Sequence, residues 1–239
     1  MNIMRINRAL SYFGVCSRRK ADNLILEKKV TVNDCLVTDL STKVDIDNDI
    51  IKLNEIIINK NIKFKYFIIN KPINYLSSNQ DPHYNLFARD LIKYNDHLFC
   101  AGRLDKDSEG LLIYTNDGEF CKILTHPRYE IEKEYIINID KNMTSNDLKT
   151  FSEGIIIDGI KTKECKIVKI KDLSYRIIIR EGRNRQIRKM CENLGYKVLK
   201  LKRIRHGKIN LGDLRVGEYR EFNSKELIYV KQLKELYVK

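Results

Sequence analysis

The chain has 239 residues, of which 43% are hydrophobic. That is enough apolar material for a packed core, in one large domain or in a small and a medium one, and it excludes wholesale disorder. Lysine and arginine number 45 against 32 acidic residues, so the formal net charge is +13. Such an excess of positive charge gives folding no benefit, because like charges repel one another in a compact chain. It therefore indicates binding of a polyanion, and nucleic acid is favoured over an anionic membrane surface.

The cysteines, the histidines and the apolar runs narrow the class of protein further. The six cysteines are scattered, with no C-x-x-C pair, and the four histidines lie far apart, which disfavours a zinc site or a disulfide framework. No apolar run approaches the ~18 residues that cross a bilayer, and the first residues lack an apolar segment of signal-peptide length. We therefore expect a reduced protein without a metal ion, located in the cytoplasm, or in an organellar stroma or matrix if the source is eukaryotic.

Residues 1–60 are predicted to form a small αα-ββ domain. Apolar residues recur at helical spacing over residues 6–13, and Gly14 suits the left-handed position that ends a helix. Ser17 is a good N-cap for a second helix. The following patterns predict a hairpin over residues 30–37 with a turn at 33–34, a strand over 50–53 and a polar linker over 54–63.

The polar faces of these two helices gather basic side chains. A solvated face explains any one of them, but so much charge of one sign beside a hairpin favours contact with phosphates. The segments RINRAL (5–10), GVCSRRKA (14–21) and VTVN (30–33) resemble an S4 RNA-binding domain, which implies binding of structured RNA through this face. The candidate RNA-binding residues are Arg5, Arg8, Ser17, Arg18, Arg19 and Lys20.

Residues 61–239 are predicted to form a second domain of the α+β class, built on a mixed or antiparallel sheet. Short apolar runs separated by Gly, Asn and Asp turns predict its strands. The predicted strands are residues 66–69, 98–101, 111–114, 135–139, 155–157, 166–170 and 176–179, with helices over 184–193 and 225–237.

A charged loop bracketed by glycines, GRLDKDSEG (102–110), joins two of these strands. Its acidic spacing is similar to the start of an EF-hand loop, but the twelfth position is Asn116 and strands flank it, so we reject calcium binding. On composition alone, the loop could equally be the solvated tip of a hairpin without a function. Asp105 lies near a strand end, where a carboxylate kept ionised by a nearby cation could act as nucleophile or base.

The segment GRNRQIR (182–188) offers such cations. Arg185 and Arg188 are three apart and share one face of the predicted helix. Arg188 adjoins the apolar stripe and is the better candidate for a semi-buried ion pair, whereas phosphates or surface carboxylates explain Arg183 and Arg185 equally well. Lys133 and Tyr135 begin a strand and point to the same side, where a tyrosine is most often plain packing.

Taken together, these motifs resemble the ribosomal RNA pseudouridine synthases with an N-terminal S4 domain, the RsuA/RluB/RluE/RluF family. The resemblance spans nearly the whole chain and is carried by segments in one fixed order. They are NKP (70–72), GRLD (102–105), TNDG (115–118), KEY (133–135), GRNRQIR (182–188), LKRIRHG (201–207) and GEYR (217–220). Ser108 stands where many relatives have Thr, and Tyr219 where many have Trp.

The resemblance implies an enzyme that converts a uridine of ribosomal RNA to pseudouridine after base flipping, with no cofactor and no metal. By the same implication, Asp105 attacks C1′ or removes a ribose proton, Arg188 pairs with Asp105, and Tyr135 stacks on the flipped base. Lys133 and Leu201 support the site, and Arg103 helps to hold the flipped nucleotide. Arg183 and Arg185 are the remaining candidate substrate-binding residues.

Two questions of function stay open at this point. Large-subunit RNA is the favoured substrate, with small-subunit RNA as the alternative, and the partner is the RNA or a precursor of the ribosome. A non-catalytic RNA-binding assembly factor is the rival of another class, disfavoured because Asp105, Tyr135 and Arg188 are all present. A cationic membrane-surface protein is disfavoured because the segment 225–239 mixes glutamates into its polar face. We expect a monomer without membrane association.

Overall fold

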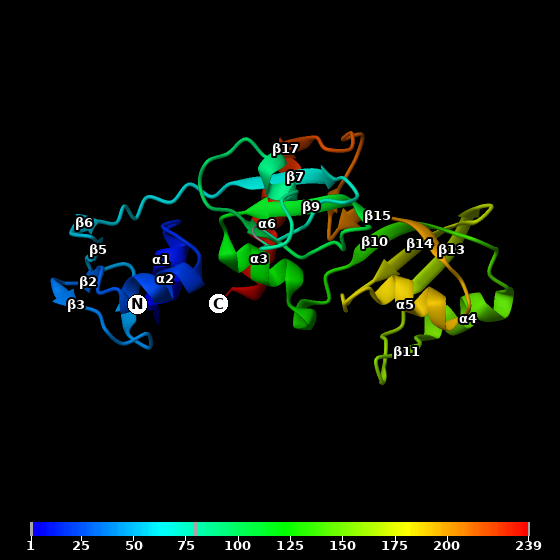
Figure 1. Ribbon diagram of the computed structural model, residues 1–239, viewed down its shortest axis with the longest axis horizontal. Coiled ribbons are helices and arrows are strands. Elements are labelled where there is room, and N and C mark those ends of the chain that lie inside the picture. The colour runs from blue at the N-terminus through cyan, green and yellow to red at the C-terminus, as the bar shows by residue number, and fades with distance from the viewer. Residues whose placement is uncertain (1, 79–80, 239) are drawn as a thin grey trace. The chain divides into compact units, whose positions relative to one another are not determined.

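The computed structural model describes residues 2–78 and 81–238. Contacts between Cα atoms divide the chain into two compact units (Figure 1). The first comprises residues up to Lys65 with 94–99 and 116–118, and the second comprises residues 66–93, 100–115 and 119 onward. In the described residues, no helix combines the length and the apolarity needed to cross a membrane.

The first unit packs two helices against short antiparallel strands. Its elements are β1 (Ile3–Arg5), α1 (Ile6–Tyr12), α2 (Arg18–Leu26), β2 (Val30–Val32), β3 (Cys35–Leu36), β4 (Lys43–Asp45), β5 (Ile51–Leu53) and β6 (Ile56–Ile57). Leu10 from α1, Ile25 from α2 and Val30 from β2 are fully buried in its core. The predicted cap is confirmed, because the Ser17 hydroxyl accepts a hydrogen bond from the Lys20 amide, 3.3 Å away.

The prediction of the hairpin turn is confirmed, whereas that of the linker is partly wrong. Asn33 and Asp34 adopt positive φ between β2 and β3, as a two-residue hairpin turn requires. The linker predicted from residue 54 is wrong at its start, since β6 pairs with β5 across a second turn, at Asn54 and Glu55. The polar residues around Ile56 and Ile57 conceal this strand, which is only two residues long.

The second unit is built on a mixed sheet, as predicted. Its strands are β7 (Tyr66–Lys71), β8 (Phe99–Cys100), β9 (Glu109–Thr115), β10 (Lys133–Ile139), β13 (Lys166–Lys171), β14 (Ser174–Ile179), β15 (Val198–His206), β16 (Ile209–Asn210) and β17 (Tyr219–Glu221). The main order is β13-β14-β10-β15-β9-β7-β17, and β9–β15 is its parallel pair. A separate small hairpin comprises β11 (Ile156–Ile157) and β12 (Ile160–Lys161).

The helices of this unit are α3 (Gly118–Thr125), α4 (Ser145–Glu153), α5 (Gln186–Asn193) and α6 (Ser224–Tyr237), with single 3₁₀ turns at Ala88–Leu91 and Pro127–Tyr129. Patterning predicts α5 and α6 but not α3 and α4. It also misses β15, in which lysines and arginines interrupt the apolar residues. The helix α5 contacts β15 of the sheet and β11 of the small hairpin, and Figure 1 shows it in the same half of the unit as β13 and β14.

Gly110 permits the parallel pair on which the second unit depends. It has φ of 110° and lies opposite Arg203 of β15. A Cβ at this position would lie 2.3 Å from the Arg203 carbonyl oxygen, a distance that real Cβ atoms do not reach. Only glycine allows β9 to leave the charged turn and join β15 at once, so this residue fixes where the turn sits relative to the central strand.

Candidate active site

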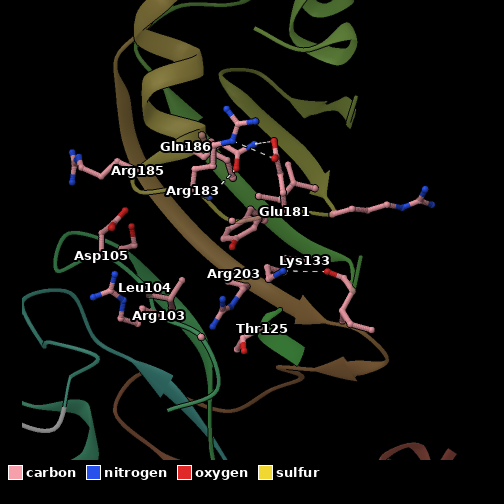
Figure 2. Close-up of a pocket in the computed structure, with 18 of the residues that line it drawn as sticks. Arg103, Leu104, Asp105, Thr125, Lys133, Glu181, Arg183, Arg185, Gln186 and Arg203 are labelled. Atoms are coloured by element: carbon pink, nitrogen blue, oxygen red, sulfur yellow. Dashed lines mark hydrogen bonds and ion pairs between the residues drawn. The ribbon is translucent and has the colours of Figure 1, made fainter. Parts of the chain in front are cut away.

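A cavity of about 150 Å³ lies in the second unit, between the turn that precedes β9, the strands β10 and β15, and the start of α5 (Figure 2). Seven of the predicted site residues line it. They are Arg103, Asp105, Lys133, Tyr135, Arg183, Arg185 and Leu201. Arg188, the remaining candidate in this unit, is not among the lining residues.

The turn that carries Asp105 is held from the segment before it. The Ser77 hydroxyl accepts a hydrogen bond from the Leu104 amide (3.0 Å) and donates to the Leu104 carbonyl (2.8 Å). The Asn74 amide donates to the Lys106 carbonyl at 2.7 Å, and the Ser108 amide donates to the Asp105 carbonyl at 3.0 Å. These bonds fix the main chain on both sides of Asp105, so the point from which its side chain leaves the backbone is set before any ligand binds.

The Asp105 carboxylate itself is unengaged. Asp105 is partly buried, and its side chain makes no hydrogen bond or ion pair within residues 2–78 and 81–238. Figure 2 shows it at the edge of the cavity, next to Arg103 and below Arg185. A carboxylate held by its backbone, with free oxygens facing a cavity, is able to act on a ligand as nucleophile or base.

The predicted ion pair between Arg188 and Asp105 is wrong in this structure, because Arg188 binds Asp107. Arg188 is 6% exposed, and its Nε lies 3.3 Å from the Asp107 carboxylate. Its terminal nitrogens donate to the carbonyls of Asp107 (2.8 Å) and Val198 (3.1 Å). Arg185 adds a second ion pair to Asp107 at 3.0 Å.

The predicted shared helix face is wrong, because Arg185 is the N-cap of α5, with φ of 51°, and lies outside the helix. The two arginines nevertheless meet one carboxylate, that of Asp107 instead of Asp105. The turn brings Asp107, two residues beyond Asp105, to the start of α5. Arg188 therefore holds the turn from the side opposite Ser77. Its link to Asp105 runs through the main chain of the turn, by way of Asp107.

The floor of the cavity comes from the adjacent strands β10 and β15. Tyr135 is 7% exposed and Leu201 is 6% exposed, and both line the cavity. Lys133 lies two residues before Tyr135, as the strand period predicts, and its Nζ donates to the Ile131 carbonyl at 3.2 Å. Burial and the nearby Arg203 lower the pKa of Lys133 to about 8.

A β-bulge shapes this floor. Glu134 pairs with Arg205 and the next residue, Tyr135, pairs with Arg203, so Ile204 has no opposite residue. The bulge lets Arg203 face the cavity while Arg205 binds Glu134 at 2.6 Å. Without the extra residue, the alternation of the strand would place the side chains of Arg203 and Arg205 on one side.

Arg203 is a site residue that sequence reasoning missed. It is 1% exposed, lines the cavity and donates from Nε to the Leu111 carbonyl at 2.8 Å. The candidate Leu201 could have indicated it, because Arg203 is two residues further along the same strand and such residues point to the same side. The strand itself was not predicted, so the signal was not used.

Two of the predicted substrate-binding arginines are already engaged with protein groups. Arg183 donates to the carbonyls of Ile160 (2.9 Å) and Lys161 (2.7 Å) and pairs with the buried Glu181. Arg185 is held by Asp107, with its side chain 40% exposed. The Arg103 side chain, by contrast, is exposed at the mouth of the cavity.

In the first unit, the candidate RNA-binding residues lie on and beside the two helices. The basic members are all exposed, namely Arg5, Arg8, Arg18, Arg19 and Lys20. Ser17 differs from them, because its hydroxyl caps α2 and is half-buried. Exposed cations of this kind are accessible to a polyanion in solution.

Comparison with known proteins agrees with this geometry. The sequence model of the family described as RNA pseudouridylate synthase matches residues 65–193, and that of the S4 domain matches residues 4–51. The ribosomal large subunit pseudouridine synthase B of Bacillus subtilis is 38% identical, over 97% of this chain and 96% of its own. The dual-specificity RNA pseudouridine synthase RluF of Escherichia coli is 35% identical, over 94% of this chain and 77% of its own.

A solved structure gives the same answer. A crystal structure of a pseudouridylate synthase superposes with a TM-score of 0.70 at 28% identity, covering 96% of this chain and 99% of that one. Family, fold and cavity thus agree along nearly the whole chain. The chain belongs to the RNA pseudouridylate synthase family, in the branch with an N-terminal S4 domain, and it is an isomerase of uridine in RNA.

Proposed function

We propose that this enzyme converts a specific uridine of large-subunit ribosomal RNA to pseudouridine. The ribosomal substrate is supported by the relative in Bacillus subtilis, which is named for the large ribosomal subunit and aligns over almost its full length. The net charge of +13 supports a polyanionic substrate independently of any relative. The enzyme works where ribosomes are assembled, which is the cytoplasm in a bacterium, and it works as a monomer.

The reaction places three demands on the site. The target uridine must leave its stack and enter the cavity, at a cost of about a few kcal/mol. The bond between N1 of the base and C1′ of the ribose must break. The detached uracil must then turn while it is held, so that C5 bonds to C1′ in place of N1. An enclosed cavity that keeps the base from diffusing away serves the last demand.

Asp105 is the residue we assign to bond cleavage. Its carboxylate either attacks C1′, forming a bond that C5 later displaces, or removes a proton from C2′ of the ribose and returns it to C2′ when C5 bonds to C1′. On both routes the electron pair of the C1′–N1 bond leaves with the uracil. When C5 has joined C1′, the C5 proton is lost and N1 gains one, so the product is an isomer of the substrate.

The single observation that carries this assignment is the state of Asp105. Its main chain is pinned by Ser77 and Asn74 on one side and, through Asp107, by Arg185 and Arg188 on the other. Its carboxylate, in the described part of the chain, has no protein partner. Fixing a reactive group while leaving its oxygens free is the arrangement that makes cleavage of a bound nucleotide fast.

Tyr135 and the basic face of the first unit complete the proposal. Tyr135 lies on the floor with Leu201, and we assign its ring to stacking on the flipped base. The exposed cations of α1 and α2 hold the surrounding RNA and select the target. This division assigns chemistry to the second unit and affinity to the first.

The test is a map of pseudouridines in ribosomal RNA from cells with and without the gene. We expect one site in large-subunit RNA to be lost and to be restored when the purified protein acts on the unmodified RNA. Loss and restoration confined to small-subunit RNA would replace the substrate while keeping the reaction. An unchanged map, with no conversion by the purified protein, would remove the proposed function.

A further inference from the structure

The guanidinium of Arg203 is buried in the cavity floor with part of its hydrogen-bonding capacity unused. Its Nε donates to the Leu111 carbonyl, but its Nη2 is buried and has no hydrogen-bond partner in the part of the chain that the structure describes. In the described residues, Arg203 makes no ion pair with any carboxylate. A buried cation without a counter-charge is costly to the folded state, so its presence beside a catalytic cavity calls for a bound partner.

The groups around Arg203 do not neutralise it. Lys133, one strand away, adds a second cation, and the fully buried His206 is kept neutral because burial and Arg203 lower its pKa well below the ordinary value. Glu181, a carboxylate of the cavity wall, already accepts hydrogen bonds from the Lys163 amide and the Gln186 side chain, and it pairs with Arg183. The floor therefore presents net positive charge toward the cavity.

The proposed function, on which this inference rests, generates a negative charge that these cations could bind. When the C1′–N1 bond breaks, the uracil departs with the bonding pair, and the negative charge spreads over N1 and the carbonyl oxygens O2 and O4. We propose that Arg203, together with Lys133, binds a carbonyl oxygen of the flipped base and stabilises the uracil anion while the base is detached. The donors are in place before the charge develops, which is the condition for a large electrostatic effect.

A phosphate of the RNA is the other anion that such a group could meet. Arg203 is 1% exposed, whereas the exposed Arg103 and the half-exposed Arg185 lie at the mouth of the cavity. The phosphates of a flipped nucleotide remain on the strand outside, since only the base and part of the sugar enter a pocket. The floor therefore faces the base, and the mouth faces the phosphates.

The experiment compares uridine with 5-fluorouridine at the target position of an RNA transcript. Fluorine withdraws electrons and makes the uracil a better leaving group, so the anion needs less help from the protein. We expect Arg203→Met to slow single-turnover consumption of the target uridine about 10²-fold. We expect the same variant to slow consumption of 5-fluorouridine at least about tenfold less. Equal losses on the two nucleotides would assign Arg203 a structural role only.

Two further readouts separate the base from the phosphate and guard against misfolding. Because a phosphate contact contributes about one to the salt slope of binding, an unchanged slope in Arg203→Met is expected, and a lower slope would overturn the proposal. If Arg203→Met does not fold, Arg203→Lys serves instead. This variant keeps the positive charge but loses the planar guanidinium. It too should be slowed less on 5-fluorouridine than on uridine if the inference is right.

Arg205→Met is the matched control. It removes an arginine from the same strand, but one that binds Glu132 and Glu134 rather than lining the cavity. We expect its losses on the two nucleotides to be small and equal. Failure of the wild-type enzyme to convert any ribosomal uridine would remove the proposed function, whereas a wild-type enzyme that works beside equal losses in Arg203→Met removes this inference alone.

Discussion

The cations of the cavity and those of the basic helical face differ in burial and in what they touch. Arg188 and Arg203 are 6% and 1% exposed and are held by named carbonyls and, for Arg188, by Asp107. Arg18 and Arg19 are exposed on α2, and within the described residues their side chains make no hydrogen bond or ion pair. Buried cations fix geometry and act at one atom, whereas exposed cations add affinity for any nearby phosphate.

The largest loss of reaction rate is expected from a change at Asp105, the residue assigned to act on the ribose. Asp105→Asn keeps the size of the side chain but removes the nucleophile or base, so the single-turnover rate should fall by at least about 10³-fold. Thermal unfolding and RNA affinity should remain close to wild type, because the carboxylate has no partner to lose among residues 2–78 and 81–238. Near-normal turnover by this variant would show that Asp105 is the wrong residue.

The next effect tests whether buried cations act through geometry. Arg188→Met releases the turn from α5 and should slow the reaction about 10²-fold with little change in RNA affinity, since small displacements of a reacting group are costly. Asp107→Asn should slow it through the same contact. Combining the two changes should cost less than the product of the single losses, because both remove one link.

Arg185→Met is the comparison for that link. Its ion pair to Asp107 is half-exposed, so its loss should slow the reaction only a few-fold. If Arg185→Met matched Arg188→Met, burial would not be what distinguishes the two arginines. Fully additive losses for Arg188→Met and Asp107→Asn would show that they act separately.

The lowered pKa of Lys133 predicts how the stability of the cavity depends on pH. Below pH about 8 the lysine is protonated in both the folded and the unfolded chain, and the cost of burying its charge is present. Between pH about 8 and about 10.4, the ordinary lysine pKa, the folded chain releases the proton first, so the free energy of unfolding gains on the order of 3 kcal/mol from this residue.

The variant Lys133→Met removes the pH-dependent contribution of Lys133 to the free energy of unfolding. Chemical denaturation across pH 8 to 10.4 should show a smaller rise in the variant than in the wild type, with the variant the more stable of the two near pH 7 if its packing is kept. Other groups, including Lys71 with a pKa lowered to about 8 by burial, contribute equally to both proteins. Identical pH profiles would contradict the assignment of a buried charge to Lys133.

The smallest effect per residue is expected on the basic helical face. Arg18→Gln with Arg19→Gln should weaken RNA binding about tenfold and lower the salt slope by about two, while the rate at saturating RNA stays unchanged. Lys231→Gln, which removes an exposed cation from α6, is the control and should change neither quantity. A lower rate at saturating RNA in the double variant would show that the first unit also positions the target.

Patterns that depend on neighbours in the sequence were the ones that could be predicted. The cap at Ser17, the hairpin turn at Asn33 and the shared side of Lys133 and Tyr135 follow from local geometry, and the structure confirms them. The charged turn between two strands was also placed correctly. Each of these depends on a spacing of a few residues, which the sequence displays directly.

Features that depend on register were not predicted. The sequence offers Arg185 and Arg188 as cations near the charged turn but does not say whether residue 105 or 107 of the turn will meet them. The bulge at Ile204 and the parallel pairing opposite Gly110 join segments about 70 to 95 residues apart, and no local pattern encodes them. Arg203 was missed for this reason, since its place in the floor exists only after both pairings form.

The central claim is tested most directly by tritium release. Unmodified large-subunit RNA carrying tritium at C5 of its uridines would be incubated with the wild-type enzyme and with Asp105→Asn, because bonding of C5 to C1′ expels the hydrogen held there. The account predicts release of about one tritium per RNA with the wild type and none with the variant, at equal RNA binding. Equal release by both proteins, or none by either, would contradict it.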